Sequence, residues 1–235
     1  MFADITQPPK ALPRADLKQL SSGITLLPPL SRRGTGPGLI VLVPKASDIL
    51  IHEGGVPSQL NKWAEEGFTV AQIETSTLTQ SSSAVADAIA ALKACDKYEE
   101  TGKIGLVAYD AQSWNTAASS LPSEISAAII YANQGDAASL AKSPVATLHH
   151  LAGAPPAEQP PVASLKNFKS YNYPAAKSHG FASPLSDDFS YSLEAVSHTR
   201  TLQFMKPVLG GPYFDLEYIW DGRTWNEFNA SQEYD

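Results

Sequence analysis

The run Lys103-Ile-Gly-Leu-Val-Ala-Tyr-Asp110-Ala-Gln-Ser-Trp114 decides the fold expected of this chain. Residues 104–108 form a short apolar run of the kind found in strands that are buried on both faces. The run stops at an acid, Asp110, and residues 115–120 are small residues typical of a helix start. A strand, a tight turn and a helix in this order predict a nucleophile elbow, which presents one side chain at the carboxyl edge of a parallel sheet. An equally open alternative is that Asp110 only caps the following helix.

Outward from this run, short apolar segments alternate with helical patterns. Further strands are predicted at residues 23–30, 39–43, 68–73, 125–131, 145–151 and 168–173. Further helices are predicted at residues 56–67, 81–100 and 187–205. Strands that alternate with helices predict an α/β fold, in which helices cover both faces of a mostly parallel central sheet. Its functional sites are expected at the carboxyl ends of the strands.

The chain is expected to have three parts. Residues 1–22 are rich in proline and polar residues and are expected to form an extended N-terminal segment. Residues 23–207 are expected to form one α/β domain, which is long enough to bury a sizeable core. Residues 208–235 are an aromatic, irregular tail. This tail either folds back on the domain or offers an apolar surface through which two copies of the chain form a homodimer.

Composition excludes several classes of function. The 235 residues carry a formal net charge of −7, which argues against nucleic acid or an anionic membrane as the main partner. No apolar run is long enough to cross a bilayer, and the N-terminus lacks the basic start and apolar centre of a signal peptide. The single cysteine, Cys95, fits a reducing compartment. We therefore expect a soluble cytoplasmic protein that acts on a small molecule.

The second candidate catalytic residue, His179, lies on the loop after the last predicted strand. It stands in the run Tyr173-Pro-Ala-Ala-Lys-Ser-His179-Gly-Phe181, late in the chain. In α/β-hydrolases the base is a histidine in this position, and it follows the elbow in chain order. Taken alone, His179 would be an ordinary loop histidine. Its position relative to Asp110 makes the two residues a candidate catalytic pair.

With both runs considered, the chain resembles the dienelactone hydrolase family, in the fungal branch labelled carboxymethylenebutenolidase-like. The resemblance covers roughly residues 38–207 and is carried by the two runs quoted above together with Gly38-Leu-Ile-Val-Leu-Val43 and Trp63-Ala-Glu-Glu-Gly-Phe68. It implies the α/β-hydrolase fold and a Cys-His-Asp triad that opens an enol-lactone. In this resemblance His179 matches the family's base, and Asp110 stands where the family has its cysteine.

The chain departs from the family at the elbow and at the triad acid. The family's Gly-aromatic-Cys-X-Gly-Gly becomes Ala108-Tyr-Asp-Ala-Gln-Ser113, so the cysteine and the turn glycines are replaced. The acid is expected after the strand that ends at Leu151, and Glu158 is the nearest carboxylate there. The resemblance therefore implies an atypical Asp-His site, with Glu158 as the candidate acid.

Further residues are expected to shape this site. The backbone N–H of Ala111 is a candidate oxyanion donor, and Pro44 begins the loop at the carboxyl end of a neighbouring strand. Tyr109 and Trp114 flank the elbow, where they either line an apolar pocket or belong to the core. The sequence calls for no cofactor, and it has no Cys/His cluster with the spacing of a metal site.

Several chemistries stay open for the Asp-His pair. A carboxylate that attacked an ester carbonyl would form an anhydride, so Asp110 suits attack at saturated carbon, with His179 activating the water that hydrolyses the resulting ester. Alternatively, the pair transfers protons in an isomerase, cyclase or lyase. The pocket could also persist as a ligand-binding site without catalysis. The resemblance places hydrolysis of a lactone, ester or related bond first.

Overall fold

The computed structural model describes residues 11–21, 23–47, 49–155 and 167–211, together with Arg223 and Glu227. The strands are β1 (Lys18–Ser21), β2 (Ile24–Leu27), β3 (Gly38–Val43), β4 (Thr69–Glu74), β5 (Ile104–Ala108), β6 (Ile125–Asn133), β7 (Ala146–Ala152) and β8 (Phe168–Tyr173). The α-helices are α1 (Gln59–Glu65), α2 (Thr75–Gln80), α3 (Ala84–Lys93), α4 (Ala111–Ala118) and α5 (Tyr191–Leu209). Three short 3-10 helices are η1 (Glu53–Gly55), η2 (Gln134–Ser139) and η3 (His179–Ala182).

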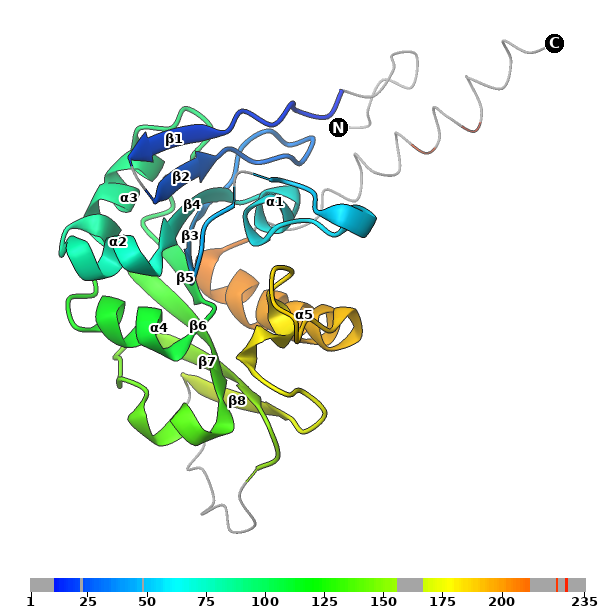
Figure 1. The fold of residues 1–235 in the computed structure, drawn as a ribbon. Coiled ribbons are helices and arrows are strands. Elements are labelled where there is room, and N and C mark those ends of the chain that lie inside the picture. Colours follow the sequence, from blue (N-terminus) through cyan, green and yellow to red (C-terminus); the bar gives the residue numbers. More distant parts are fainter. Residues whose placement is uncertain are drawn as a thin grey trace.

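The eight strands form one sheet in the order β1-β2-β4-β3-β5-β6-β7-β8 (Figure 1). The pairs β1–β2 and β2–β4 are antiparallel, and the remaining neighbours are parallel. The predicted α/β architecture with a mostly parallel sheet is therefore confirmed. The carboxyl ends of β3 to β8 lie along one edge because these strands all run in the same direction.

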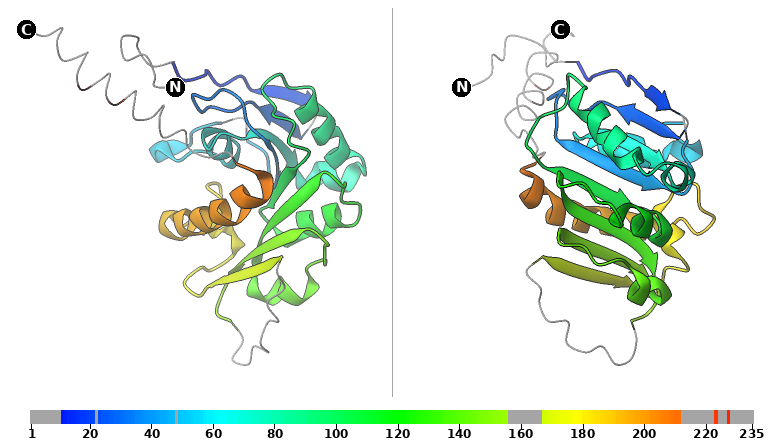
Figure 2. Two further views of the ribbon diagram at one scale, coloured as in Figure 1. Left: turned by 180° about the vertical axis from the view of Figure 1, so that it is seen from behind. Right: turned by 90° about the vertical axis from the view of Figure 1, so that its left-hand side faces the viewer.

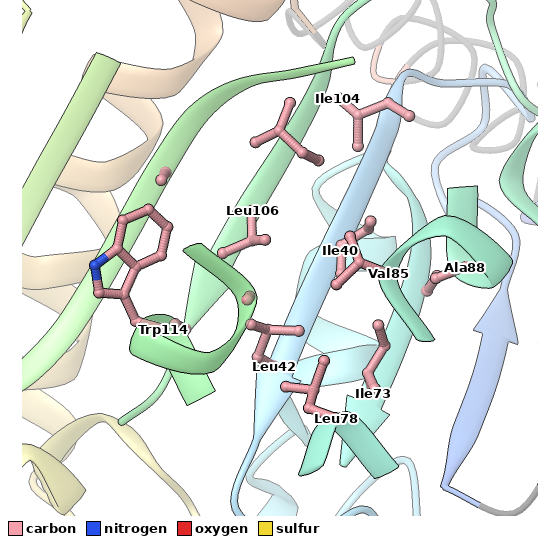
Figure 3. Packing of buried hydrophobic residues seen from close by; sticks show 14 of the residues in the cluster. Ile40, Leu42, Ile73, Leu78, Val85, Ala88, Ile104, Leu106 and Trp114 are labelled. Atoms are coloured by element: carbon pink, nitrogen blue, oxygen red, sulfur yellow. The ribbon is translucent and has the colours of Figure 1, made fainter. Parts of the chain in front are cut away.

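Helices cover both faces of the sheet, as Figures 1 and 2 show: α2, α3 and α4 pack on one face, and α1 and α5 pack on the other. The central strand β3 shows the consequence, since all six of its residues are buried. Ile40 and Leu42 join the core under α2 to α4, where Figure 3 shows them beside Leu106. Leu39 and Val41 point into the core under α1 and α5.

At two places a predicted boundary is wrong because tertiary pairing overrides local pattern. Residues 18–21, expected to be extended coil, form strand β1 and pair with β2. The helix expected over residues 81–100 is shorter, since α3 ends at Lys93 and the following residues turn back toward Gly36. There the Glu99 N–H donates to the Gly36 carbonyl at 2.8 Å, and the Gly36 N–H donates to the Lys97 carbonyl at 3.0 Å.

The last helix, α5, continues four residues past its predicted end at residue 205. It ends at Gly210, whose φ of 78° is the left-handed conformation that closes many helices and that glycine adopts most readily. Residues 212–222 and most of the remaining tail lie outside the described residues, and so does Glu158. Within the described ranges, no helix has the length and apolar character needed to span a membrane.

Candidate active site

An open pocket of about 450 Å³ lies at the carboxyl edge of the sheet, where β3, β4, β5 and β6 end. It is lined by Pro44, Thr75, Asp110, Ala111, Gln112, Asp136 and His179. The two predicted catalytic residues therefore share one pocket, although they are 69 positions apart in the sequence. Pro44 and Ala111 line it as expected. As a proline, Pro44 has no backbone N–H to donate, so it contributes only a wall.

Asp110 is the N-cap of α4, so it does cap the following helix. Its Oδ1 accepts a hydrogen bond from the Ser113 backbone N–H at 2.7 Å. Its φ of −155° and ψ of 159° are those of ordinary extended backbone. A nucleophile elbow holds its nucleophile in a strained turn, and no non-glycine residue in the described ranges has a positive φ. The strand, turn and helix follow one another as β5, Tyr109–Asp110 and α4, and the turn carries no positive φ.

The second carboxylate oxygen of Asp110 remains available to a ligand. Oδ2 lies 3.4 Å from the Thr75 hydroxyl, which is 3.0 Å from the Val43 carbonyl. Because a hydroxyl has one proton, the Thr75 proton goes to the closer acceptor, the Val43 carbonyl. Asp110 is only 8% exposed, so Oδ2 is an acceptor in a largely buried position beside an open pocket.

The start of α4 adds backbone donors to the same pocket. The first N–H groups of a helix have no partner within the helix. Ser113 is capped by Asp110, whereas the N–H groups of Ala111 and Gln112 have no hydrogen-bond partner among the described residues. The positive end of the helix dipole strengthens them as donors to negative charge. These two groups can stabilise an oxyanion, as predicted for Ala111.

His179 opens η3 and is anchored to the end of β6. Its backbone N–H donates to Asn133 Oδ1 at 2.8 Å, and its ring Nδ1 lies 3.4 Å from the same oxygen. Asn133 is in turn bound by Asp136, whose Oδ2 accepts from Asn133 Nδ2 at 3.1 Å. No hydrogen bond or ion pair between described residues joins His179 directly to Asp110.

Sequence reasoning missed Asn133 and Asp136. The acid partner of His179 was expected after β7, where Glu158 lies outside the described residues, whereas Asp136, which follows β6, is linked to His179 through Asn133. A signal was present, because Asn133-Gln-Gly-Asp136 places polar residues directly after a buried apolar strand. Strand β6 also runs two residues further than predicted, which carries Asn133 to the edge where Asp110 lies.

Two of the expected pocket residues lie elsewhere. Trp114 is fully buried in the core under α2 to α4, and its indole N–H donates to the Ala141 carbonyl at 3.0 Å (Figure 3). Tyr109 lines a neighbouring hollow of about 240 Å³ instead of the Asp110 pocket. Because side chains alternate along a strand, Tyr109 points to the face covered by α1 and α5.

A second polar cluster, the α5 layer, lies on that face and consists of Tyr109, Tyr131, His150, Tyr173, Ser197 and Thr201. The Tyr109 hydroxyl accepts from the Trp63 indole N–H at 3.1 Å, and its ring stacks on Tyr131 at 5.0 Å. The Tyr131 hydroxyl lies 3.1 Å from Ser197 Oγ. The ring nitrogens of His150 lie 2.8 Å from the Tyr173 hydroxyl and 2.9 Å from the Thr201 hydroxyl.

Burial dominates the electrostatics of the α5 layer. It raises the pKa of Tyr109 well above the ordinary value, so the phenol stays protonated. It lowers the pKa of His150 to about 3, so the imidazole stays neutral near pH 7. The adjacent His149 lies on the opposite face of β7, against Phe168, and the described residues contain no cluster of three metal-binding side chains.

Comparison with known proteins shows similarity in fold. No family model and no curated protein matches this chain in sequence. Among solved structures, the chain is similar to the AtxE2 isopeptidase, with a TM-score of 0.55 and 12% identity over 92% of this chain and 44% of that one. It is also similar to a sugar hydrolase (YeeB) from Lactococcus lactis, with a TM-score of 0.52 and 11% identity over 83% of this chain and 98% of that one.

These likenesses establish the α/β-hydrolase fold of the chain. At 11% and 12% identity they say nothing of activity or of membership in a narrower family. The chain spans less than half the length of the AtxE2 isopeptidase. The resemblance to the dienelactone hydrolase family stays a prediction.

Proposed function

We propose that this protein is a dienelactone hydrolase-like enzyme that hydrolyses a lactone, ester or related bond of a small molecule. One observation carries the proposal: an acid, a histidine and two unpaired backbone N–H groups converge on one open pocket at the carboxyl edge of the sheet. General base, charge stabiliser and oxyanion donors are the groups that ester hydrolysis requires.

The chemistry that suits these residues is direct attack by water. Asp110 is a poor nucleophile for an ester carbonyl because the product would be an anhydride, and its Oδ1 is already engaged as the cap of α4. His179 instead takes a proton from a water molecule, whose oxygen attacks the carbonyl carbon. The imidazolium then returns the proton to the leaving alkoxide.

Two further groups act on the charges that form. Negative charge on the carbonyl oxygen is stabilised by the N–H groups of Ala111 and Gln112. Positive charge on the His179 ring is stabilised by the Asp110 carboxylate across the pocket. Both charges form in the transition state, so these groups favour the reaction over simple binding.

A second candidate is proton transfer in an isomerase, cyclase or lyase, or ligand binding without catalysis. The observation that favours it is the role of Asp110 as an ordinary helix cap with extended backbone. In such a protein, the pocket would bind a small molecule, and Asp110 and His179 would contribute hydrogen bonds or exchange protons without cleaving an ester.

The test is hydrolysis of a small substrate panel: a dienelactone, short-chain nitrophenyl esters, a haloacid and an epoxide. The wild type is compared with Asp110→Asn and His179→Ala, and His149→Ala is a matched control because His149 lies outside the pocket. We expect ester or lactone turnover that falls in both pocket variants and persists in the control. Turnover indifferent to both pocket changes would refute this site, and no turnover on any substrate would favour the second candidate.

A further inference from the structure

We infer that Asn133, held by Asp136, is the positioning residue for His179. In this arrangement the Asn133 side-chain carbonyl fixes the ring of this pocket residue with its proton on Nδ1 and leaves Nε2 as the acceptor nitrogen. A neutral amide thus takes the orienting role that a carboxylate has in a Ser-His-Asp triad. The consequence for catalysis rests on the proposed function, whereas the geometry does not.

The partners of Asn133 determine which way its amide points. Its Oδ1 faces two donors of His179, the backbone N–H at 2.8 Å and ring Nδ1 at 3.4 Å. Its Nδ2 donates to Asp136 Oδ2. A flipped amide would place an NH₂ group against the His179 N–H and an oxygen against a carboxylate, so both contacts would be repulsive. The observed orientation is the one that satisfies all of these groups.

Asp136 holds Asn133 at two points. Besides the contact with Nδ2, its Oδ2 accepts from the Asn133 backbone N–H at 3.3 Å, which forms a capping box at the start of η2. Asn133 is also the last residue of β6, where it is in register with Ala152 of β7. A side chain on a paired strand and bound by a carboxylate has little freedom, so it can orient a histidine on a neighbouring loop.

The proton position on His179 is the property that this arrangement controls. A neutral imidazole has one donor and one acceptor nitrogen, and an oxygen acceptor beside Nδ1 favours the tautomer with the proton on Nδ1. The lone pair is then on Nε2, which is the nitrogen that can take a proton from water. Removing the Asn133 carbonyl should leave both tautomers populated and the ring orientation less defined.

The test measures the tautomer itself, by long-range ¹H–¹⁵N NMR of the whole ¹⁵N-labelled chain. The chain has five histidines, so the His179 signals are assigned by their loss in His179→Gln. We expect the Nδ1–H tautomer to dominate in the wild type and a mixture of tautomers in Asn133→Ala. Asn172→Ala is the matched control, because Asn172 donates to Gln134 on η2 but has no bond to His179.

Exchanging the side chains of Asn133 and Asp136 separates an effect on the orientation of His179 from an effect on folding. Asn133→Asp alone places two carboxylates side by side, so we expect it to disturb the network. Asn133→Asp combined with Asp136→Asn restores a carboxylate–amide pair in reversed order, and an acceptor again faces Nδ1. We expect this exchange to recover the Nδ1–H tautomer, and unchanged His150 signals will verify the fold of each variant.

The outcomes are distinct for the two proposals. An unchanged Nδ1–H tautomer in Asn133→Ala would overturn the positioning role, whether or not the protein hydrolyses esters. The expected tautomer shift would support it even in a protein without ester turnover, which would count against the proposed function alone. If both hold, Asn133→Ala lowers kcat about tenfold or more with KM nearly unchanged, because the base is misoriented and the pocket walls are intact.

Discussion

The α5 layer and the Asp110–His179 pocket begin at adjacent residues of one strand end and differ in how their polar groups are satisfied. Tyr109 points into the α5 layer, where it bonds to Trp63 and stacks on Tyr131. Asp110 points to the pocket and keeps one carboxylate oxygen without a strong partner. The side chains of the layer are buried, and the pocket is open to solvent.

This difference shows which polar residues are structural and which are available for function. Buried polar groups are almost always paired, because an unpaired one costs free energy. The His150 ring has partners for both nitrogens, so it is accounted for as part of the core. In the pocket, Asp110 Oδ2 and the N–H groups of Ala111 and Gln112 have capacity left for a ligand.

The largest effect should come from the pocket histidine. His179→Ala should lower kcat/KM on the best ester or lactone by about 10²- to 10⁴-fold, the usual contribution of a general base. Since His179 is only partly buried, the free energy of unfolding should change by less than about 0.5 kcal/mol. Steady-state kinetics measure the loss of kcat/KM, and urea unfolding measures the change in the free energy of unfolding. If the variant lost stability together with activity, the role of His179 would be structural.

Trp114 tests the structural role of buried residues, because it was a candidate pocket residue and lies in the core. Trp114→Ala should lower the free energy of unfolding by about 3–5 kcal/mol, through lost burial and the cavity left behind. Trp114→Phe should cost less. Chemical unfolding gives both values. A loss below about 1 kcal/mol for the alanine variant would contradict the core position.

Acid should destabilise the α5 layer through His150. Its folded-state pKa of about 3 lies below the unfolded value of about 6.5, so the unfolded chain takes up a proton first as the pH falls. The contribution of neutral His150 to the free energy of unfolding is complete above pH 6.5 and is lost as the pH falls toward 3. Between pH 7.5 and 4.5 the loss should be about 3 kcal/mol.

Urea unfolding at these two pH values, for the wild type and His150→Gln, measures the contribution. Because the variant keeps the other titrating groups, the difference between the two pH dependences isolates His150. An equal pH dependence in both proteins would mean that His150 is protonated in the folded state or that water reaches it.

Asp110 has both a structural role, as the cap of α4, and a proposed role in the pocket. Two substitutions should separate these roles. Asp110→Asn keeps an oxygen that accepts from the Ser113 N–H, and its stability should stay within about 0.5 kcal/mol of the wild type. Asp110→Ala loses the cap and should cost about 1 kcal/mol. Thermal unfolding compares them. If only the alanine variant lost activity, Asp110 would be a cap and no part of the reaction.

The sequence by itself determined the strands β2 to β8 and the common edge of the parallel ones. Strands buried on both faces must be continuous apolar runs, so β3 and β5 could be located within about one residue. Because parallel strands share a carboxyl edge, Asp110 and His179 were expected to meet there, and they line one pocket. Helix ends were less predictable, since the residues after α3 form a bridge with Gly36, which is distant in sequence.

Only the tertiary structure decided the partners of each polar side chain. The assignment of Tyr109 and Trp114 to the core depends on α1, α5 and the loop at Ala141, which are distant in sequence. The role of Asn133 likewise depends on a bond to His179, 46 positions away. Local pattern reports apolar periodicity and backbone preference, which are properties of neighbouring residues. Hydrogen-bond satisfaction is a property of the folded chain, because it is set by whichever groups folding brings within about 3 Å.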